Sequence, residues 1–225
     1  MRFFGRSSCR AWLQACLLGT ASLAAHAAPI DDLTVAAYRD NGYEIGKLLA
    51  AGVDPNAADA RGRHAINIAL IEQSDRAVKA LLAYPRLDAN VRNANGETPL
   101  MLAALKGRLD WVQMLVARGA LINLAEGWTP LHYACSGPDN GVALWLLSQG
   151  ADINARSPND STPLMMAARY GDITTAEQLL KAGAEPRLAN EQNLTAADFA
   201  QAAGRDGLAK LLNAAMAAAN AKARR

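Results

Sequence analysis

Apolar and polar positions along the chain recur in two short phrases that alternate with each other. The first phrase is a threonine followed by a run of apolar and small residues, and its threonines are spaced 31, 33 and 33 residues apart: Thr98, Thr129, Thr162 and Thr195. The second phrase has five positions: a leucine, another apolar residue, two variable residues and a glycine. It begins at Leu48, Leu115, Leu146 and Leu179. Recurrence at a fixed period indicates a repeat architecture, in which each unit buries its apolar faces against its neighbours.

The unit that begins at Thr98 shows what each phrase predicts. Thr98 is a good N-cap, and Pro99 stands at the first helical position, where proline is tolerated. Small and apolar residues then fall on one face of a short helix that Gly107 ends. A second helix follows, and its apolar face carries Leu109, Val112, Leu115 and Val116. Gly119 closes that helix at a position where a positive φ is needed.

These phrases resemble those of the ankyrin repeat family, which combine G-x-T-P-L-H-x-A-A, a helix that ends in two leucines, and G-A-D-I-N. The resemblance covers Asp31 to Asn213. It implies an all-α ankyrin repeat solenoid of about six helix-turn-helix units joined by short β-hairpin loops. The units expected from the spacing are 31–58, 59–92, 93–124, 125–155, 156–189 and 190–215. The first, second and last match the family pattern loosely, as terminal caps do.

Two irregularities interrupt the repeat. Asn123 lies four residues before Gly127, whereas Asn90 lies six before Gly96, so the hairpin before Trp128 is two residues shorter and leaves a notch in the row of tips. The segment 137–141 replaces the usual turn between the helices of the fourth unit, and its proline is expected outside the helices or in a first turn. Adaptation to a partner and neutral drift both remain open.

The first 27 residues are typical of a secretory signal peptide. Three arginines precede an apolar run from Ala15 to Ala25, and Ala25-His26-Ala27 forms an A-x-A cleavage pattern. We therefore expect a signal peptide at 1–27, cleaved near Ala27, a repeat domain at 28–215 and an alanine-rich tail at 216–225, which extends the last helix or frays. A weaker alternative is lipidation at Cys16. The short signal indicates a bacterial protein, periplasmic or secreted.

Charge excludes some partners. Removal of the signal peptide takes away three arginines and no acidic residue, so the formal net charge falls from +2 to −1. A chain with no basic excess has little to attract a phosphate backbone, so we expect no nucleic acid partner. No later segment is long and apolar enough to span a membrane, and we expect a monomer whose partner is another protein.

The sequence offers no constellation for catalysis, for a cofactor or for a metal. His132 lies in a Thr-Pro-Leu-His phrase, where the resemblance implies a ring that bonds between neighbouring turns. His64 replaces the threonine of its unit and is expected to be a cap or surface residue. Cys135 stands at a small-residue helix position and indicates buried packing. With no paired ligand spacing and no nucleophile elbow, we predict that the chain is not an enzyme.

The resemblance also implies where a partner binds, namely at the hairpin tips and along the exposed side of each first helix, in a concave groove. Aromatic and arginine side chains most often anchor protein interfaces. Carried over to this chain, the expected partner-binding residues are Tyr38, Arg39, Arg61, Arg63, Asn95, Lys106, Trp128, Tyr133, Arg169 and Tyr170. Trp145 is interpreted as core packing, and the role of Trp111 stays open.

The sequence therefore predicts an exported protein-binding module that stabilises an exported enzyme or neutralises a toxin. Two alternatives remain: a cofactor-binding protein or enzyme with an atypical site, and a secreted effector directed at a host.

Overall fold

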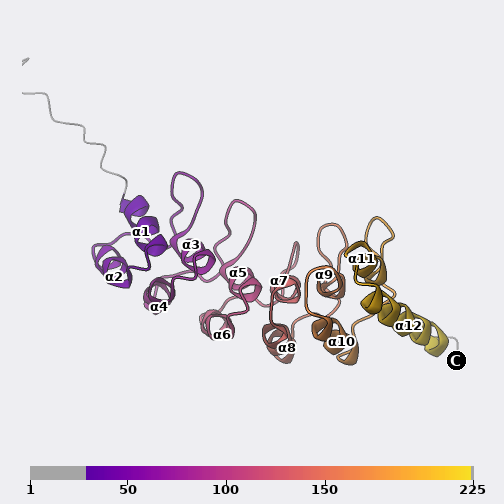
Figure 1. Cartoon of the computed structure of the whole chain (residues 1–225). Coiled ribbons are helices and arrows are strands. Elements are labelled where there is room, and N and C mark those ends of the chain that lie inside the picture. Colours follow the sequence, from indigo (N-terminus) through magenta and orange to yellow (C-terminus); the bar gives the residue numbers. More distant parts are fainter. Residues whose placement is uncertain (1–28, 224–225) are drawn as a thin grey trace, which may run out of the picture.

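The computed structural model describes residues 29–223, which form an extended stack of helix pairs (Figure 1). The expected signal peptide and Cys16 lie outside the described residues. In the described part of the chain the helices are α1 Pro29–Tyr38, α2 Gly42–Ala50, α3 Ala65–Ile71, α4 Asp75–Ala83, α5 Pro99–Leu105, α6 Leu109–Ala117, α7 Pro130–Ser136, α8 Asn140–Ser148, α9 Pro163–Arg169, α10 Ile173–Lys181, α11 Ala196–Ala202 and α12 Asp206–Ala223.

The helices form two parallel rows, and each consecutive pair makes one repeat unit. The odd-numbered helices form one row and the even-numbered helices the other, with long loops extending beside the odd-numbered row (Figure 1). Each odd-numbered helix packs on the next, from α1 on α3 to α9 on α11. The predicted all-α solenoid of six helix-turn-helix units is confirmed.

The boundaries of the helices follow the expected chemistry. The Thr98 hydroxyl accepts a hydrogen bond from the backbone N–H of Met101 at 3.4 Å, and Thr162 caps α9 in the same way through Met165. Gly107 has φ +69° after α5, and Gly119 has φ +86° after α6. A side chain at either glycine would be strained in this left-handed conformation, so both helix ends are fixed by the glycines.

The long loops are turns closed by an Asx or serine residue rather than extended strands. In the second unit the backbone N–H of Asp59 donates to the carbonyl of Arg63 at 2.9 Å, and the Asp59 carboxylate accepts from the N–H groups of Arg61 and Arg63. Asn93, Ser157 and Asn190 make the same backbone bond across their loops. Among the described residues, extended pairing is limited to the isolated bridges Ala58–His64 and Ala189–Thr195.

Asparagines tie each unit to the next at the base of these loops. Asn90 donates from its amide to the carbonyl of Gly119 at 3.0 Å and accepts from the N–H of Leu121 at 2.9 Å. Asn56 and Asn123 form the same pair of bonds one unit away in each direction. The asparagine in G-A-D-I-N therefore acts as an inter-unit tie that satisfies backbone groups the helix ends leave free.

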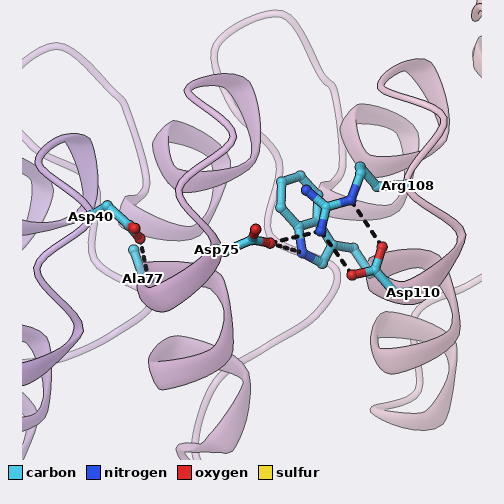
Figure 2. A network of polar contacts seen from close by, with 6 residues as sticks. Asp40, Asp75, Ala77, Arg108 and Asp110 are labelled. Atoms are coloured by element: carbon cyan, nitrogen blue, oxygen red, sulfur yellow. Dashed lines mark hydrogen bonds and ion pairs between the residues drawn. The ribbon is translucent and has the colours of Figure 1, made fainter.

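A second inter-unit contact resolves the role of Trp111. This indole is fully buried, its Nε1–H donates to Asp75 at 3.1 Å, and the Arg108 guanidinium lies 3.8 Å from its ring centroid (Figure 2). Arg108 also bonds Asp75 at 2.7 Å and Asp110 at 2.8 Å. We call these four residues the Arg108 clamp. Trp111 is thus a packing residue that joins the second unit to the third.

The segments outside the regular pattern agree with the sequence in part. Pro138 lies between α7 and α8, outside both helices as predicted. Trp145 is partly buried and packs against the core. The alanine-rich segment continues α12 to Ala223 without a break at residue 215. His64 stands at the N-cap position of α3, one of the two places expected for it, but makes no side-chain cap bond. Its two ring nitrogens lie 2.9 Å from the carbonyl oxygen of Asn56 and 3.1 Å from that of Arg92, and the nitrogen that carries the proton donates to its carbonyl.

Candidate functional site

A pocket of about 200 Å³ opens where α5, α7 and α9 lie side by side, and its lining is mostly apolar. It is lined by Leu105, Trp128, His132, Tyr133, Ser136 and Met166. These helices belong to the row that faces the loops (Figure 1). The pocket brings together two of the predicted partner-binding residues, Trp128 and Tyr133, from the fourth unit.

Trp128 is held by the histidine of its own unit. Its ring meets the His132 ring edge-on, with centroids 5.3 Å apart and planes at 82°. His132 is fixed on both sides: Nδ1 lies 2.9 Å from the Thr129 hydroxyl, and Nε2 lies 3.0 Å from the carbonyl of Ser161 in the next unit. Burial lowers the pKa of His132 to about 4, because the charged ring would lose its hydration. The predicted bond between neighbouring turns is confirmed.

Tyr133 is anchored to the preceding unit. Its hydroxyl donates to the Glu97 carboxylate at 3.0 Å, and Glu97 also accepts from the Asn93 amide at 2.8 Å. Burial and the neighbouring Glu97 charge raise the pKa of Tyr133 well above its usual value. The ring is therefore a half-buried, neutral and pre-positioned surface, which loses little conformational freedom when a partner covers it.

The pocket is part of a longer apolar face. Tyr133 and Met166 stand at equivalent positions in their units, and the positions equivalent to them in all six units are apolar: Val35, Ile68, Leu102, Tyr133, Met166 and Phe199. We call the side of the odd-numbered helices that carries them the inner face. Ile68, Leu102, Met166 and Phe199 are buried in the core. The exposed apolar area of this face therefore lies at the half-buried Tyr133 and at the N-terminal end, where Val35, Tyr38 and Ile71 are 45%, 62% and 42% exposed. Exposed apolar area of this kind marks interaction sites.

The remaining predicted residues lie around this face in separate places. Arg169 and Tyr170 are exposed at the end of α9, with the guanidinium 5.3 Å from the Tyr170 ring centroid. Tyr38 is exposed at the end of α1, whereas Arg39 lines a different depression of about 530 Å³ beside Tyr43 and Arg76. The structure therefore does not bring Arg39 to the pocket.

The predicted loop residues differ in their freedom. Arg61 and Asn95 are exposed near the tips of the second and third loops, and Lys106 is partly exposed at the end of α5. Arg63 is instead paired with Asp59 at 2.7 Å. Burial alone would raise the pKa of Asp59, but the hydrogen bonds from Arg63 and Arg61 outweigh it and hold the pKa below its usual range. The Arg63 guanidinium is thus already paired within its own loop, and it is less available to a partner than Arg61.

Sequence reasoning missed the contribution of His132 and Met166 to the pocket. Both stand in helical positions that the repeat pattern assigns to packing, and each is less than 10% exposed. The signal available in the sequence was the pair of bulky residues Tyr133 and Met166 at equivalent positions of adjacent units. His132 and Met166 therefore pack in the core and also line the pocket.

The groups that could act chemically are withdrawn from solvent. Cys135 is fully buried, and burial raises the pKa of its thiol far above the usual value, so little reactive thiolate forms. Within residues 29–223 no group of three histidine, cysteine, aspartate or glutamate side chains is placed to hold a metal ion. None of the described helices is long and apolar enough to cross a membrane.

Comparison with known proteins places the chain in a broad group of repeat proteins. The family model described as ankyrin repeats (3 copies) matches residues 33–126, 87–157 and 139–223. The mouse B-cell lymphoma 3 protein homolog is 32% identical over 154 residues, which is 66% of this chain and 34% of that protein. The chicken nuclear factor NF-kappa-B p105 subunit is 30% identical over 67% of this chain and 16% of its own length. The chain spans about a third or less of these relatives.

Two bacterial structures match over most of their own length. One is a chain from the structure of a predatory endopeptidase of Bdellovibrio bacteriovorus in complex with an immunity protein; it has a TM-score of 0.69 and 28% identity, covering 80% of this chain and 96% of that chain. The other is an ankyrin repeat domain from Acinetobacter baumannii, with a TM-score of 0.67 and 26% identity, covering 82% of this chain and 97% of that chain.

Proposed function

Because the chain belongs to the ankyrin repeat family, whose repeats mediate protein–protein interaction, we propose that it binds a partner protein through its inner face and loop tips. The observation that carries this proposal is the pocket between α5, α7 and α9. Its Trp128 and Tyr133 rings are held in place by His132 and Glu97 before any partner arrives. Rigid aromatic anchors in a partly apolar pocket are the residues that dominate binding energy in protein interfaces.

The inner face has room for such an interface. A stable complex buries about 800 Å² on each partner, so two or three adjacent units are enough. The exposed Arg169 and Tyr170 belong to the fifth unit, next to the fourth unit that carries Trp128 and Tyr133. Tyr38 and Ile71 add exposed apolar surface toward the N-terminus. We propose that the partner covers the third to fifth units first, because the pocket and its anchored rings lie there.

We further propose that the chain acts in the periplasm of a bacterium after removal of residues 1–27, and that its partner is an exported enzyme. The signal-like N-terminus supports export. The similarity to a chain from an endopeptidase–immunity protein complex supports an enzyme as the partner, with this chain as its inhibitor. The buried thiol of Cys135 and the buried ring of His132 support a chain that catalyses no reaction of its own.

The test is native affinity capture from a periplasmic extract with mass spectrometry, using wild-type protein and a Trp128→Ala/Tyr133→Ala variant. We expect the wild type to capture a defined partner and the variant to lose at least about 90% of it, since central aromatic truncations cost about 2 kcal/mol or more. A matched control replaces two exposed apolar residues of the even-numbered helices, Tyr43 and Leu144, with alanine. This control should capture as wild type does.

Trp128 and Tyr133 are partly buried, so a second variant separates binding from folding. Arg169→Ala/Tyr170→Ala changes only exposed side chains at the end of α9, the helix that carries Met166 of the pocket. It should keep the wild-type melting temperature and helical circular dichroism, yet weaken capture several-fold. Unchanged capture by both variants would place the interface elsewhere and overturn the proposal, as would the absence of any partner specific to the wild type.

A further inference from the structure

The loop before α7 is shorter than its neighbours and leaves a gap in the row (Figure 1). When the fourth loop is aligned on the third and fifth, the two missing residues correspond to Arg92-Asn93 and Arg156-Ser157. Asn93 and Ser157 close the turns of their loops, so the fourth loop lacks that closure. A depression of about 540 Å³ occupies this place, lined by Arg92, Glu126, Gly127, Arg156, Ser157 and Pro158. We call it the loop notch.

The missing residues also leave an arginine without its usual inter-unit partner. Arg156 donates from Nη1 to the carbonyl of Asp160 in its own loop at 2.9 Å and to the carbonyl of Ala189 in the next loop at 2.7 Å. Arg92 is the equivalent residue of the third unit, and among the described residues its side chain bonds only the carbonyl of Gly96 in its own loop, at 3.3 Å from Nη1. The position that would match Ala189 is one of the two residues absent from the fourth loop.

The notch therefore presents unused donors. A guanidinium carries five N–H donors in a planar fork that matches a carboxylate. Arg92 and Arg156 are both exposed, neither forms an ion pair among the described residues, and they approach the notch from opposite sides. Glu126 is the one carboxylate in the lining, which leaves the notch with a net positive charge.

The notch adjoins the apolar pocket. Gly127 lines the notch and Trp128, the next residue, lines the pocket. An inserted segment would therefore meet a cationic surface next to an aromatic surface. Two residues of the neighbouring loops have no counterpart here, so the depression has room for a short stretch of a partner's chain.

We propose that the loop notch receives a loop of the partner protein that carries a carboxylate beside an apolar residue, with the carboxylate on Arg92 and Arg156 and the apolar side chain in the pocket at Trp128. This inference rests on the proposed function and names the part of the partner that is recognised. The fourth loop is two residues shorter than its neighbours, and the depression that results is the proposed site. We therefore assign the selectivity for the partner to this shortening.

The test uses a library of disulfide-closed heptapeptides displayed on phage, panned against the purified chain. Peptides with aspartate or glutamate next to an apolar residue should be enriched, and the most frequent one is then titrated as a free peptide. Two variants change the notch: Arg92→Gln, and an insertion of Arg-Asn between Leu124 and Ala125 that restores the length of the third loop. Arg86→Gln, at an exposed arginine beyond α4, is the matched control.

Arg92→Gln should weaken the peptide about tenfold, the usual effect of losing a charge-assisted hydrogen bond. The insertion should abolish binding, because the inserted residues occupy the notch, and Arg86→Gln should have no effect. Glu126→Gln should strengthen binding about two- to fivefold, since it removes a like charge at an exposed site. A purely structural notch would not produce this gain.

Three results would overturn the inference: no enriched peptide, enriched peptides without a carboxylate, or full binding to the insertion variant. Inorganic phosphate at high concentration should compete weakly, and competition equal to the peptide's own affinity would identify a simple anion site instead. If the capture experiment succeeds and the insertion variant captures the same partner equally well, the notch proposal fails while the protein-binding function stands.

Discussion

At the scale of single residues, His132 and Asn67 show two outcomes at one repeat position. Both stand at the third position of an odd-numbered helix and both are at least 98% buried. His132 bonds Thr129 on one side and Ser161 on the other, whereas neither polar atom of the Asn67 side chain has a hydrogen-bond partner among the residues that the structure describes. Methionines fill the same position in α5 and α9. The position accepts varied side chains, but only the histidine reaches the next unit.

The buried ring makes stability depend on pH. The pKa of His132 falls from 6.5 to about 4 on folding, so the unfolded chain binds more protons at this site between those values. Stability contributed by the neutral ring is full above the unfolded pKa and is lost as the pH falls toward 4. We expect His132 to account for a loss of roughly 2 kcal/mol in the free energy of unfolding between pH 7 and pH 5.

The measurement is urea unfolding of wild type and His132→Met at both pH values. Methionine suits the position, because the sulfur atoms of Met101 and Met165 accept from the N–H of Thr98 and Thr162. Acidic residues titrate in both proteins, so the difference between them isolates His132. Equal pH slopes in wild type and variant would show that the histidine is not buried in its neutral form.

At the scale of elements, the helices are too short to be stable alone, and contacts between units stabilise them. Eleven of the helices among the described residues have ten residues or fewer, which is below the length at which an isolated helix is stable. Asparagine ties join units at the loop side, and the Arg108 clamp joins α4 to α6 at the other end of these helices (Figure 2). Each helix is thus stabilised by its neighbours.

The clamp gives a paired prediction. Asp75→Ala should lower the free energy of unfolding by about 1–2 kcal/mol, because the buried Trp111 N–H loses its acceptor. The ion pair adds little to this figure, since the Asp75 side chain is 50% exposed. Asp110→Ala removes only an exposed partner of Arg108 and should cost about 0.5 kcal/mol or less. Thermal or urea unfolding of the two variants checks this order, and an equal loss in both would contradict the assigned role of Asp75.

The elements could be predicted from the sequence because local signals set them. Thr98, Pro99, Gly107 and Gly119 mark helix ends through capping and positive φ, which depend on nearby residues alone. The roles of Trp111 and His64 could not be predicted in this way. Each depends on a distant residue that the stack brings close: Asp75, 36 positions from Trp111, and the carbonyl of Arg92, 28 positions from His64. The same limit hid the contribution of Met166 to the pocket.

At the scale of the whole molecule, the chain is a row of units in which each contacts only its neighbours, so a local change in one unit leaves the others in place. The shortened fourth loop is such a change: the stack continues through it, and both flanking loops keep their turns. A repeat protein can therefore carry a distinct site in one unit without loss of the fold. In this molecule the pocket and the loop notch fall together in the middle units.

The most direct test of this account is amide hydrogen exchange on the chain with and without the partner captured from the periplasmic extract. Binding through the inner face predicts slower exchange in the loops before α5, α7 and α9 and at the ends of those helices. The even-numbered helices α6, α8 and α10 should be unchanged. Protection confined to the even-numbered helices, or none in the third to fifth units, would contradict the account.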